Sequence, residues 1–222
     1  MNTALRTNDT TTISVPAARV AIAAALVALL LLASLHVLSP EFDPSWRVVS
    51  EYANGRYGWV LSMMFALWAL SSWALVVAIW SQVRGIGGKI ALGFLVAAGV
   101  GEAMASVFDI NHPLHDLAGM IGVLSLPVAA MWISMRLARA QGWSVSKPML
   151  LWTANLTWVS LVLMIVAFIM LTRGHARADS ESSSHMIAWI GWANRFLVVA
   201  YCVWVVTVAR LALRVRRQPR PT

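Results

Sequence analysis

Residues 145–171 read VSKPMLLWTANLTWVSLVLMIVAFIML, and this stretch decides the fold class. Its one charged residue is Lys147, close to its start. A helix needs roughly 20 apolar residues to cross a bilayer core about 30 Å thick, so the stretch is long enough to span. A span must be a helix or a barrel strand, because lipid offers the backbone no hydrogen-bond partners. The stretch lacks the alternation of a barrel strand, so it predicts a transmembrane helix.

The composition of the whole chain agrees with this prediction. The 222 residues are 59% hydrophobic and 12% charged, with a mean hydropathy of +0.72. Soluble domains carry about 25% charged residues, and disordered chains are poor in apolar residues. Both classes are therefore excluded. The single cysteine, Cys202, rules out an intrachain disulfide and a cysteine-based zinc motif.

Six apolar runs predict an all-α membrane protein, a bundle of six transmembrane helices. The spans fall at about 17–38, 58–81, 89–108, 115–136, 148–172 and 186–213. They make one transmembrane domain over 17–213, between an N-terminal tail (1–16) and a basic tail (214–222). The first run is longer than the apolar region of a signal peptide and no clear cleavage site follows it, so we expect a retained helix.

The basic residues predict the orientation. Five of the 17 lysines and arginines fall on the side away from the termini: Arg47, Arg56, Arg173, Arg177 and Arg195. The others fall on the side of the termini. Because cytoplasmic loops carry the excess of Lys and Arg, we expect both termini to be cytoplasmic in the cell's inner (plasma) membrane. The excess of basic residues on the side of the termini accounts for the net charge of +8. The expected partner is therefore the lipid bilayer, and no nucleic acid is expected.

Histidines and acids gather on the predicted outer side. All five histidines and every acid except Asp9 fall there. The densest group is DINHPLHD, residues 109–116, in the turn between spans three and four. Helix capping accounts for part of it: Pro113 would sit in the first helical turn, Asn111 or His112 would cap it, and Asp116 would favour the helix dipole.

Capping leaves the two histidines of this turn unexplained. His112, His115 and Asp116 are plausible ligands for a zinc-like divalent ion, although no fixed spacing such as HExxH is present. Capping and metal binding both stay open. His36, near the outer end of the first span, is interpreted as a side chain that reaches back to the interface.

Two charges fall deep inside the predicted spans, well away from the span ends. Glu102 and Arg195 each lie about 9 to 10 Å inside the outer helix ends, from the rise per residue. Charges at such depth usually pair or face a cavity. We expect either a structural ion pair between them or a polar pocket. Small residues such as Gly99 and Gly101 predict close packing of span three and a central place for it in the bundle.

Several motifs resemble a known family. Residues 39–59 read SPEFDPSWRVVSEYANGRYGW, a Phe-Asp turn ends span three, and His115 opens span four. Gly191-Trp-Ala-Asn-Arg195 opens span six, which carries Trp204 before its basic end. This order resembles the bacterial and archaeal membrane proteins catalogued as domain-of-unknown-function family 998. The resemblance implies a six-helix membrane fold without an established activity. It raises the expectation that Ser50, Glu51, His115 and Arg195 matter as a set.

The leading functional hypothesis is a polytopic inner-membrane protein with a polar pocket in its outer half, binding a lipid headgroup, a small molecule or a metal ion. The pocket would be lined by Glu102, Asp109, His115, Asp116 and Arg195, with Ser50 and Glu51 from the first outer loop.

Four alternatives are kept. A lipid hydrolase at the outer leaflet would hold an ion with His112, His115 and an aspartate, and the ion would lower the pKa of a bound water. A transporter is disfavoured because matched broken helices are missing. A haem protein would take His36 and His115 as axial ligands. A structural or regulatory membrane partner needs no chemistry at all.

Overall fold

The computed structural model describes residues 13–175 and 189–217, in which six long helices follow one another. Each of them is long and apolar enough to cross a membrane. The described residues form no strand. The predicted six-helix all-α bundle is therefore confirmed, and the chain is a multi-pass membrane protein. The helices are α1 (Val15–Leu38), α2 (Gly58–Ile79), α3 (Ile86–Val107), α4 (His115–Leu137), α5 (Lys147–His175) and α7 (Ile190–Arg217).

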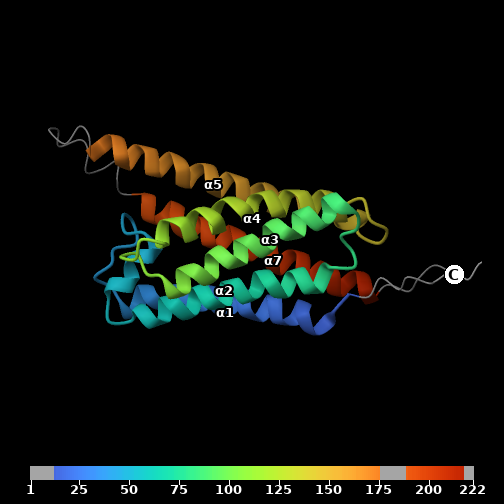
Figure 1. Cartoon of the computed structure of the whole chain (residues 1–222), viewed down its shortest axis with the longest axis horizontal. Helices are drawn as coiled ribbons and strands as arrows, with labels where there is room; N and C mark the ends of the chain where they lie inside the picture. Colours follow the sequence, from blue (N-terminus) through green and yellow to red (C-terminus); the bar gives the residue numbers. More distant parts are fainter. Residues whose placement is uncertain (1–12, 176–188, 218–222) are drawn as a thin grey trace, which may run out of the picture.

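The six helices run in alternating directions along the bundle (Figure 1). One end of the bundle, called here the loop end, consists of residues 39–57, residues 108–114 and the start of α7. The other end, called the basic end, consists of the start of α1, residues 80–85, residues 138–146 and the end of α7. A short 3-10 helix, η2 (Ser144–Ser146), lies at the basic end.

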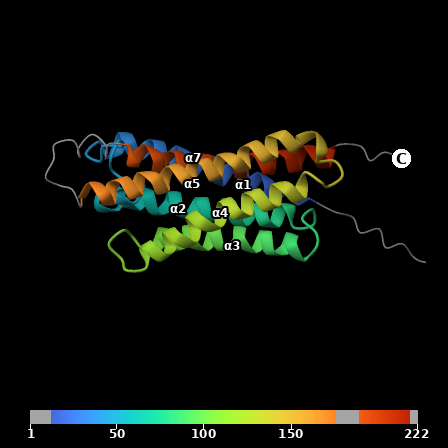
Figure 2. The ribbon, with the colours of Figure 1, turned by 90° about the horizontal axis from the view of Figure 1, so that it is seen from above.

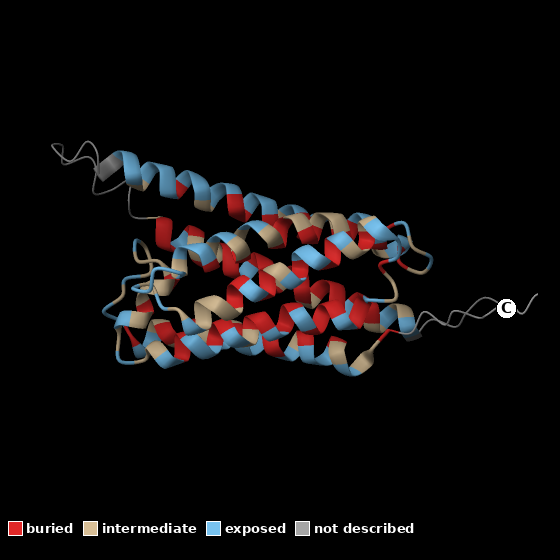
Figure 3. Ribbon diagram, viewed as in Figure 1, coloured by how far each residue is buried: buried red, intermediate tan, exposed pale blue. Residues whose placement is uncertain are grey.

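Helix α7 is the core of the bundle. It packs against α1, α2, α4 and α5, and 72% of its most apolar window is buried, the largest share of any span. Buried residues follow it along its length in Figure 3. Helix α3 packs mainly against α2 and α4, and Figure 2 shows it along one side of the bundle. The expectation that span three is central is therefore wrong.

The small residues of α3 serve one close contact instead. A Cβ atom added at Gly101 would lie 2.3 Å from the backbone nitrogen of Gly122 and 2.6 Å from the carbonyl oxygen of Ala118. No side chain fits there, so the backbones of α3 and α4 touch. The predicted close packing of span three is confirmed. The contact at Gly101 joins α3 to α4 alone, and a contact with one neighbouring helix does not require α3 to lie in the centre of the bundle.

The outward faces of the helices are apolar, as lipid contact requires. Helix α5 exposes Val159, Val162 and Phe168 among many others, and Figure 3 shows how much of it is uncovered. The five most exposed tryptophans lie at the two ends of the bundle. Trp46, Trp59 and Trp192 are at the loop end, while Trp80 and Trp152 are at the basic end. Tryptophan is enriched at both faces of a bilayer, which places the bundle ends at the two interfaces.

Candidate functional site at the loop end

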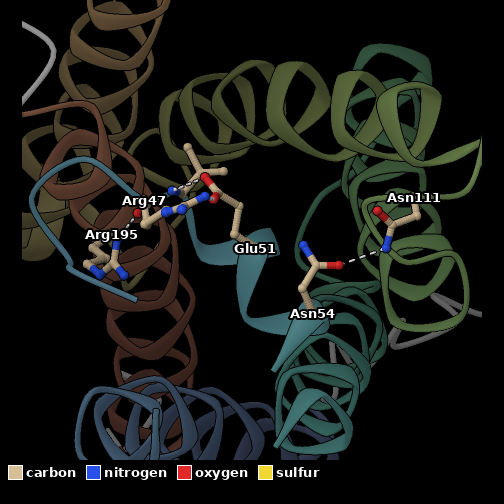
Figure 4. Close-up of polar contacts among 6 residues, drawn as sticks. Arg47, Glu51, Asn54, Asn111 and Arg195 are labelled. Atoms are coloured by element: carbon tan, nitrogen blue, oxygen red, sulfur yellow. Dashed lines mark hydrogen bonds and ion pairs between the residues drawn. The ribbon is translucent and has the colours of Figure 1, made fainter. Parts of the chain in front are cut away.

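A short 3-10 helix, η1 (Val49–Asn54), organises the loop end. The Glu51 carboxylate accepts the Val48 backbone N–H at 3.1 Å, and this bond closes the start of the helix. The same carboxylate pairs with the Arg47 guanidinium one turn earlier. Figure 4 shows η1 between the two sides of the loop end, with Arg47 and Glu51 toward Arg195 and Asn54 toward Asn111. The helix is thus positioned by its own side chains and by contacts on both flanks.

Ser50 of η1 and His115 of α4 form a hydrogen-bonded pair. The distance from Ser50 Oγ to His115 Nε2 is 3.0 Å, and His115 Nδ1 lies 2.8 Å from the Phe108 carbonyl oxygen. A carbonyl only accepts, so in the neutral imidazole Nδ1 carries the hydrogen and Nε2 is left to accept the Ser50 hydroxyl. Both side chains are half-buried. The pair is therefore oriented and within reach of solvent.

A second bond fastens η1 to the turn between α3 and α4. Asn111 Nδ2 donates to Asn54 Oδ1 at 2.8 Å, one helical turn beyond Ser50 (Figure 4). Together with the Ser50–His115 bond, it ties residues far apart in the sequence into one unit. The predicted residues Ser50 and His115 are thus brought together by the fold.

Arg195 is a buried guanidinium whose contacts hold the first loop. It is 4% exposed and donates to four acceptors. These are His36 Nε2 at 2.8 Å, the Arg47 carbonyl at 2.7 Å, the Gly191 carbonyl at 3.0 Å and the Tyr52 hydroxyl at 3.0 Å. The guanidinium is therefore satisfied by neutral oxygen and nitrogen atoms. Its contact with the carbonyl of Arg47 places it next to η1, in the same polar network as Glu51.

His36 does not reach outward as expected. Its Nδ1 donates to the Leu32 carbonyl at 2.8 Å within α1, and its Nε2 accepts the Arg195 Nε–H. The ring also stacks on Trp192 with centroids 6.5 Å apart. The interpretation of His36 as an interfacial side chain is wrong, because the buried guanidinium of α7 needs an acceptor on α1.

The start of α7 is shaped to receive the first loop. A Cβ atom at Gly191 would lie 2.3 Å from the Pro44 carbonyl oxygen and 2.6 Å from that of Arg47, so only glycine lets the loop lie against the helix. Asn194 Oδ1 accepts the Val49 N–H at 2.7 Å. The motif Gly191-Trp-Ala-Asn-Arg195 therefore places three loop-binding residues on one helix turn.

Glu102 is not part of this network. It is 4% exposed, its Oε2 accepts the Ser72 hydroxyl of α2 at 2.9 Å, and its Oε1 is buried without a hydrogen-bond partner. No ion pair joins Glu102 to Arg195, and both residues lie in the described part of the chain. The predicted pairing is wrong. Helix α3 packs on α2 and α4, and Arg195 takes its acceptors from the first loop and α1.

The remaining acids and His112 of the 109–116 turn are exposed. Asp109 accepts the Asn111 backbone N–H at 2.9 Å, and His112 Nδ1 accepts that of Leu114 at 3.2 Å. Helix α4 begins at His115, so Pro113 lies in the turn and no side chain caps the helix. The expected capping by Asn111 or His112 is therefore wrong. Asp116 does lie in the first turn of α4.

The geometry gives no support to the metal and haem interpretations. Among residues 13–175 and 189–217, no three His, Cys, Asp or Glu side chains are placed to hold a metal ion. Both ring nitrogens of His115 and of His36 are already in hydrogen bonds. Binding of an ion by His112, His115 and Asp116 stays a prediction. The transporter and purely structural interpretations also stay predictions.

The first loop carries a stabilised negative charge beside the buried guanidinium. The hydroxyl and the backbone N–H of Ser45 both bond to Asp43, at 2.7 and 2.8 Å. These bonds hold the pKa of Asp43 below its usual value, and Arg195 lowers the pKa further. Asp43 therefore stays ionised at neutral pH.

Sequence analysis gave no role to two residues that complete the site, Tyr52 and Asn194, and it gave His36 a role other than its contact with Arg195. Tyr52 follows the Ser-Glu pair, and Asn194 precedes Arg195, so both lay inside motifs already noted. Their roles depend on contacts across 143 to 159 positions of sequence. A signal was available for Asn194, because an amide near the start of an apolar span needs a partner.

Comparison with characterised proteins and with solved structures gives no significant match. The family model described as a protein of unknown function (DUF998) matches residues 22–211. That range includes η1, the turn before α4 and the motif at the start of α7. It confirms the resemblance that the order of these motifs indicated. The chain belongs to this family of proteins of unknown function.

Proposed function

We propose that the protein is a serine hydrolase that cleaves acyl bonds of membrane amphiphiles at its loop end, with Ser50 as nucleophile and His115 as general base. One observation carries the proposal: His115 Nε2 lies 3.0 Å from Ser50 Oγ while its Nδ1 is fixed on the Phe108 carbonyl at 2.8 Å. A nucleophile and a base in hydrogen-bond contact, with the base oriented by a third group, is the arrangement that covalent catalysis needs.

The tautomer supports the assignment. Because the Phe108 carbonyl accepts a hydrogen bond from Nδ1–H, the neutral His115 ring has no hydrogen on Nε2. The Nε2 lone pair then faces the Ser50 hydroxyl. A neutral imidazole that accepts from a serine is ready to remove its proton. The carbonyl would also stabilise the imidazolium that forms, since it accepts from Nδ1 in both states.

The reaction would take two balanced steps. The Ser50 oxygen attacks the carbonyl carbon of the acyl group while its proton passes to His115 Nε2. The leaving alcohol then takes that proton as its bond to the acyl carbon breaks. Water hydrolyses the acyl-serine with the same base, which restores both side chains. The Ser50 backbone N–H is available for the oxyanion, because the first N–H groups of a helix lack intrahelical acceptors.

The position of the pair indicates the substrate class. Ser50 and His115 lie at the loop end of the bundle, where the rings of Trp46, Trp59 and Trp192 are exposed. This is the depth at which a bilayer carries its headgroups and acyl linkages. Recognition of a lipid headgroup would then be the first step of the reaction. With the termini in the cytoplasm, the substrate would come from the outer leaflet.

A fluorophosphonate probe tests the proposal, because it modifies only serines that a base activates. We expect the purified protein to be labelled at Ser50, with no labelling in Ser50→Ala and a loss of about 100-fold or more in His115→Ala. Ser45→Ala, in the same loop, and His112→Ala, in the same turn as His115, are the matched controls and should keep the rate of labelling.

Three outcomes would overturn the proposal. The first is an unlabelled wild-type protein, and the second is labelling that survives Ser50→Ala. The third is that His112→Ala and His115→Ala reduce the rate of labelling by equal, small amounts. The Ser50–His115 hydrogen bond would then serve only to hold η1 in place. Labelling at Ser50 that a chelator abolishes would instead support the metal-assisted alternative.

A further inference from the structure

A cavity of about 220 Å³ lies at the basic end, between the start of α1 and the end of α7. Val15 and Arg19 line it from α1, and Leu213 and Arg216 line it from α7. The spacings of four and three residues put each pair on one face of its helix. The cavity therefore has two apolar and two cationic side chains, one of each kind from either helix.

The two guanidiniums have no negative partner within the described residues. Neither Arg19 nor Arg216 takes part in a hydrogen bond or ion pair there, and both are exposed. The acids of the described residues are all in or near the loop end: Glu41, Asp43, Glu51, Glu102, Asp109 and Asp116. Two cations that share one cavity repel each other, and an anion between them would remove that repulsion.

The helix dipoles add little net potential at the cavity. The first turn of α1 contains no acidic residue, and the N-cap residue Ser14 makes no side-chain capping bond. The dipole of α1 places partial positive charge at this end, and the C-terminal end of α7 places partial negative charge beside it, so the two helix dipoles largely offset each other. The two guanidiniums are therefore the groups that attract an anion.

We propose that this cavity binds the phosphate of an anionic phospholipid, with Arg19 and Arg216 on the phosphate oxygens. Guanidinium groups match phosphate geometry with paired N–H donors. The cavity lies where two membrane spans end, which is the depth of the headgroups. Val15 and Leu213 offer an apolar wall to the glycerol and upper acyl carbons. Free phosphate shares the charged chemistry and lacks that apolar part.

Binding measurements on the detergent-purified full chain test the proposal with three probes: phosphatidylglycerol, phosphatidylcholine and inorganic phosphate. Native mass spectrometry would count the bound lipid, and the thermal unfolding midpoint would report stabilisation. We expect phosphatidylglycerol to bind and to raise the midpoint. In Arg19→Gln with Arg216→Gln, its affinity should fall about tenfold or more, since charge-assisted hydrogen bonds are lost. The control pair Arg84→Gln with Arg139→Gln has the same charge change at the same end and should retain the affinity.

Each other result would contradict the proposal. Equal losses in the two double variants would show a diffuse response to positive charge. If phosphatidylcholine binds as tightly as phosphatidylglycerol, the cavity does not select for the net negative charge of the headgroup. Stabilisation by inorganic phosphate as strong as that by phosphatidylglycerol would identify a soluble anion as the ligand. Both arginines are exposed and outside the core, so the variants should have the wild-type unfolding midpoint in the absence of lipid. That measurement verifies that the variants are folded.

Discussion

Replacing Arg195 by methionine tests whether the first loop depends on the buried guanidinium. Methionine keeps length and helix propensity, and it removes the charge and the donors. The change leaves three acceptors without their partner: His36 Nε2, the Arg47 carbonyl and the Tyr52 hydroxyl. An orphaned buried acceptor costs about 1–3 kcal/mol.

The expected loss of unfolding free energy is about 3 kcal/mol. The low figure of about 1 kcal/mol per acceptor applies, because the loop end lies near water and His36 is only half-buried. Release of the guanidinium from its buried position offsets part of any larger loss. Arg56→Met is the control: this arginine is exposed at the same end, so its replacement should change stability by less than about 0.5 kcal/mol.

Two measurements check the prediction. Equilibrium unfolding in mixed micelles gives the loss of free energy, and hydrogen exchange gives its place in the chain. We expect faster exchange at the Val49 and Gly191 amides, because Val49 donates to Asn194 Oδ1 of α7 and Gly191 of α7 donates to the Ser45 carbonyl of the loop. If Arg195→Met is no less stable than Arg56→Met, or if those amides keep their protection, the guanidinium does not hold the loop.

A double variant tests the separation of Arg195 from Glu102. The two residues share no hydrogen-bond partner, so the effects of Glu102→Gln and Arg195→Met on the unfolding free energy should add within about 0.5 kcal/mol. If the double variant is more stable than either single variant, Glu102 and Arg195 do interact as an ion pair, and the separation seen in their contacts is contradicted.

Two further predictions concern the loop contact and the orientation. Gly191→Ala should destabilise by about 1–3 kcal/mol because its Cβ would meet backbone oxygens, while Gly119→Ala, with nothing within 4 Å, should be neutral or slightly stabilising in thermal unfolding. For orientation, a cysteine at Arg56 should react with an impermeant thiol reagent in intact cells, and one at Gln141 only after permeabilisation. The reverse labelling pattern would place the termini outside.

The six spans were predictable from the sequence because the bilayer imposes a length and a composition on each helix separately. One described helix is His115–Leu137 where the sequence predicts a span over 115–136, and the start of the predicted span 186–213 lies outside the described residues. The capping prediction failed at α4 because the first residue of the helix depends on the backbone conformation of the preceding turn, which the sequence does not specify. Pro113 fits a helix start in principle, but it lies inside the turn at 112–115, and α4 begins only where that turn ends, at His115.

The candidate site was predictable as a set of residue types and not as a set of contacts. Ser50, His115 and Arg195 stood out because polar side chains are rare and expensive near lipid. Which of them touch was open, since many pairings satisfy a guanidinium or a carboxyl. The opposite charges of Glu102 and Arg195 favoured an ion pair, whereas the structure satisfies Arg195 with neutral acceptors.

The sequence by itself determined the class of protein, the number of spans and the end of the bundle at which His36, His112 and His115 lie, because the hydropathy and length of each span depend only on its own residues. Only the tertiary structure decided that α7 is central, that the first loop lies on Gly191, and that Ser50 meets His115. These facts depend on how helices pack side by side. In a membrane, packing is set by close van der Waals fit and interhelical hydrogen bonds, which residue periodicity does not encode.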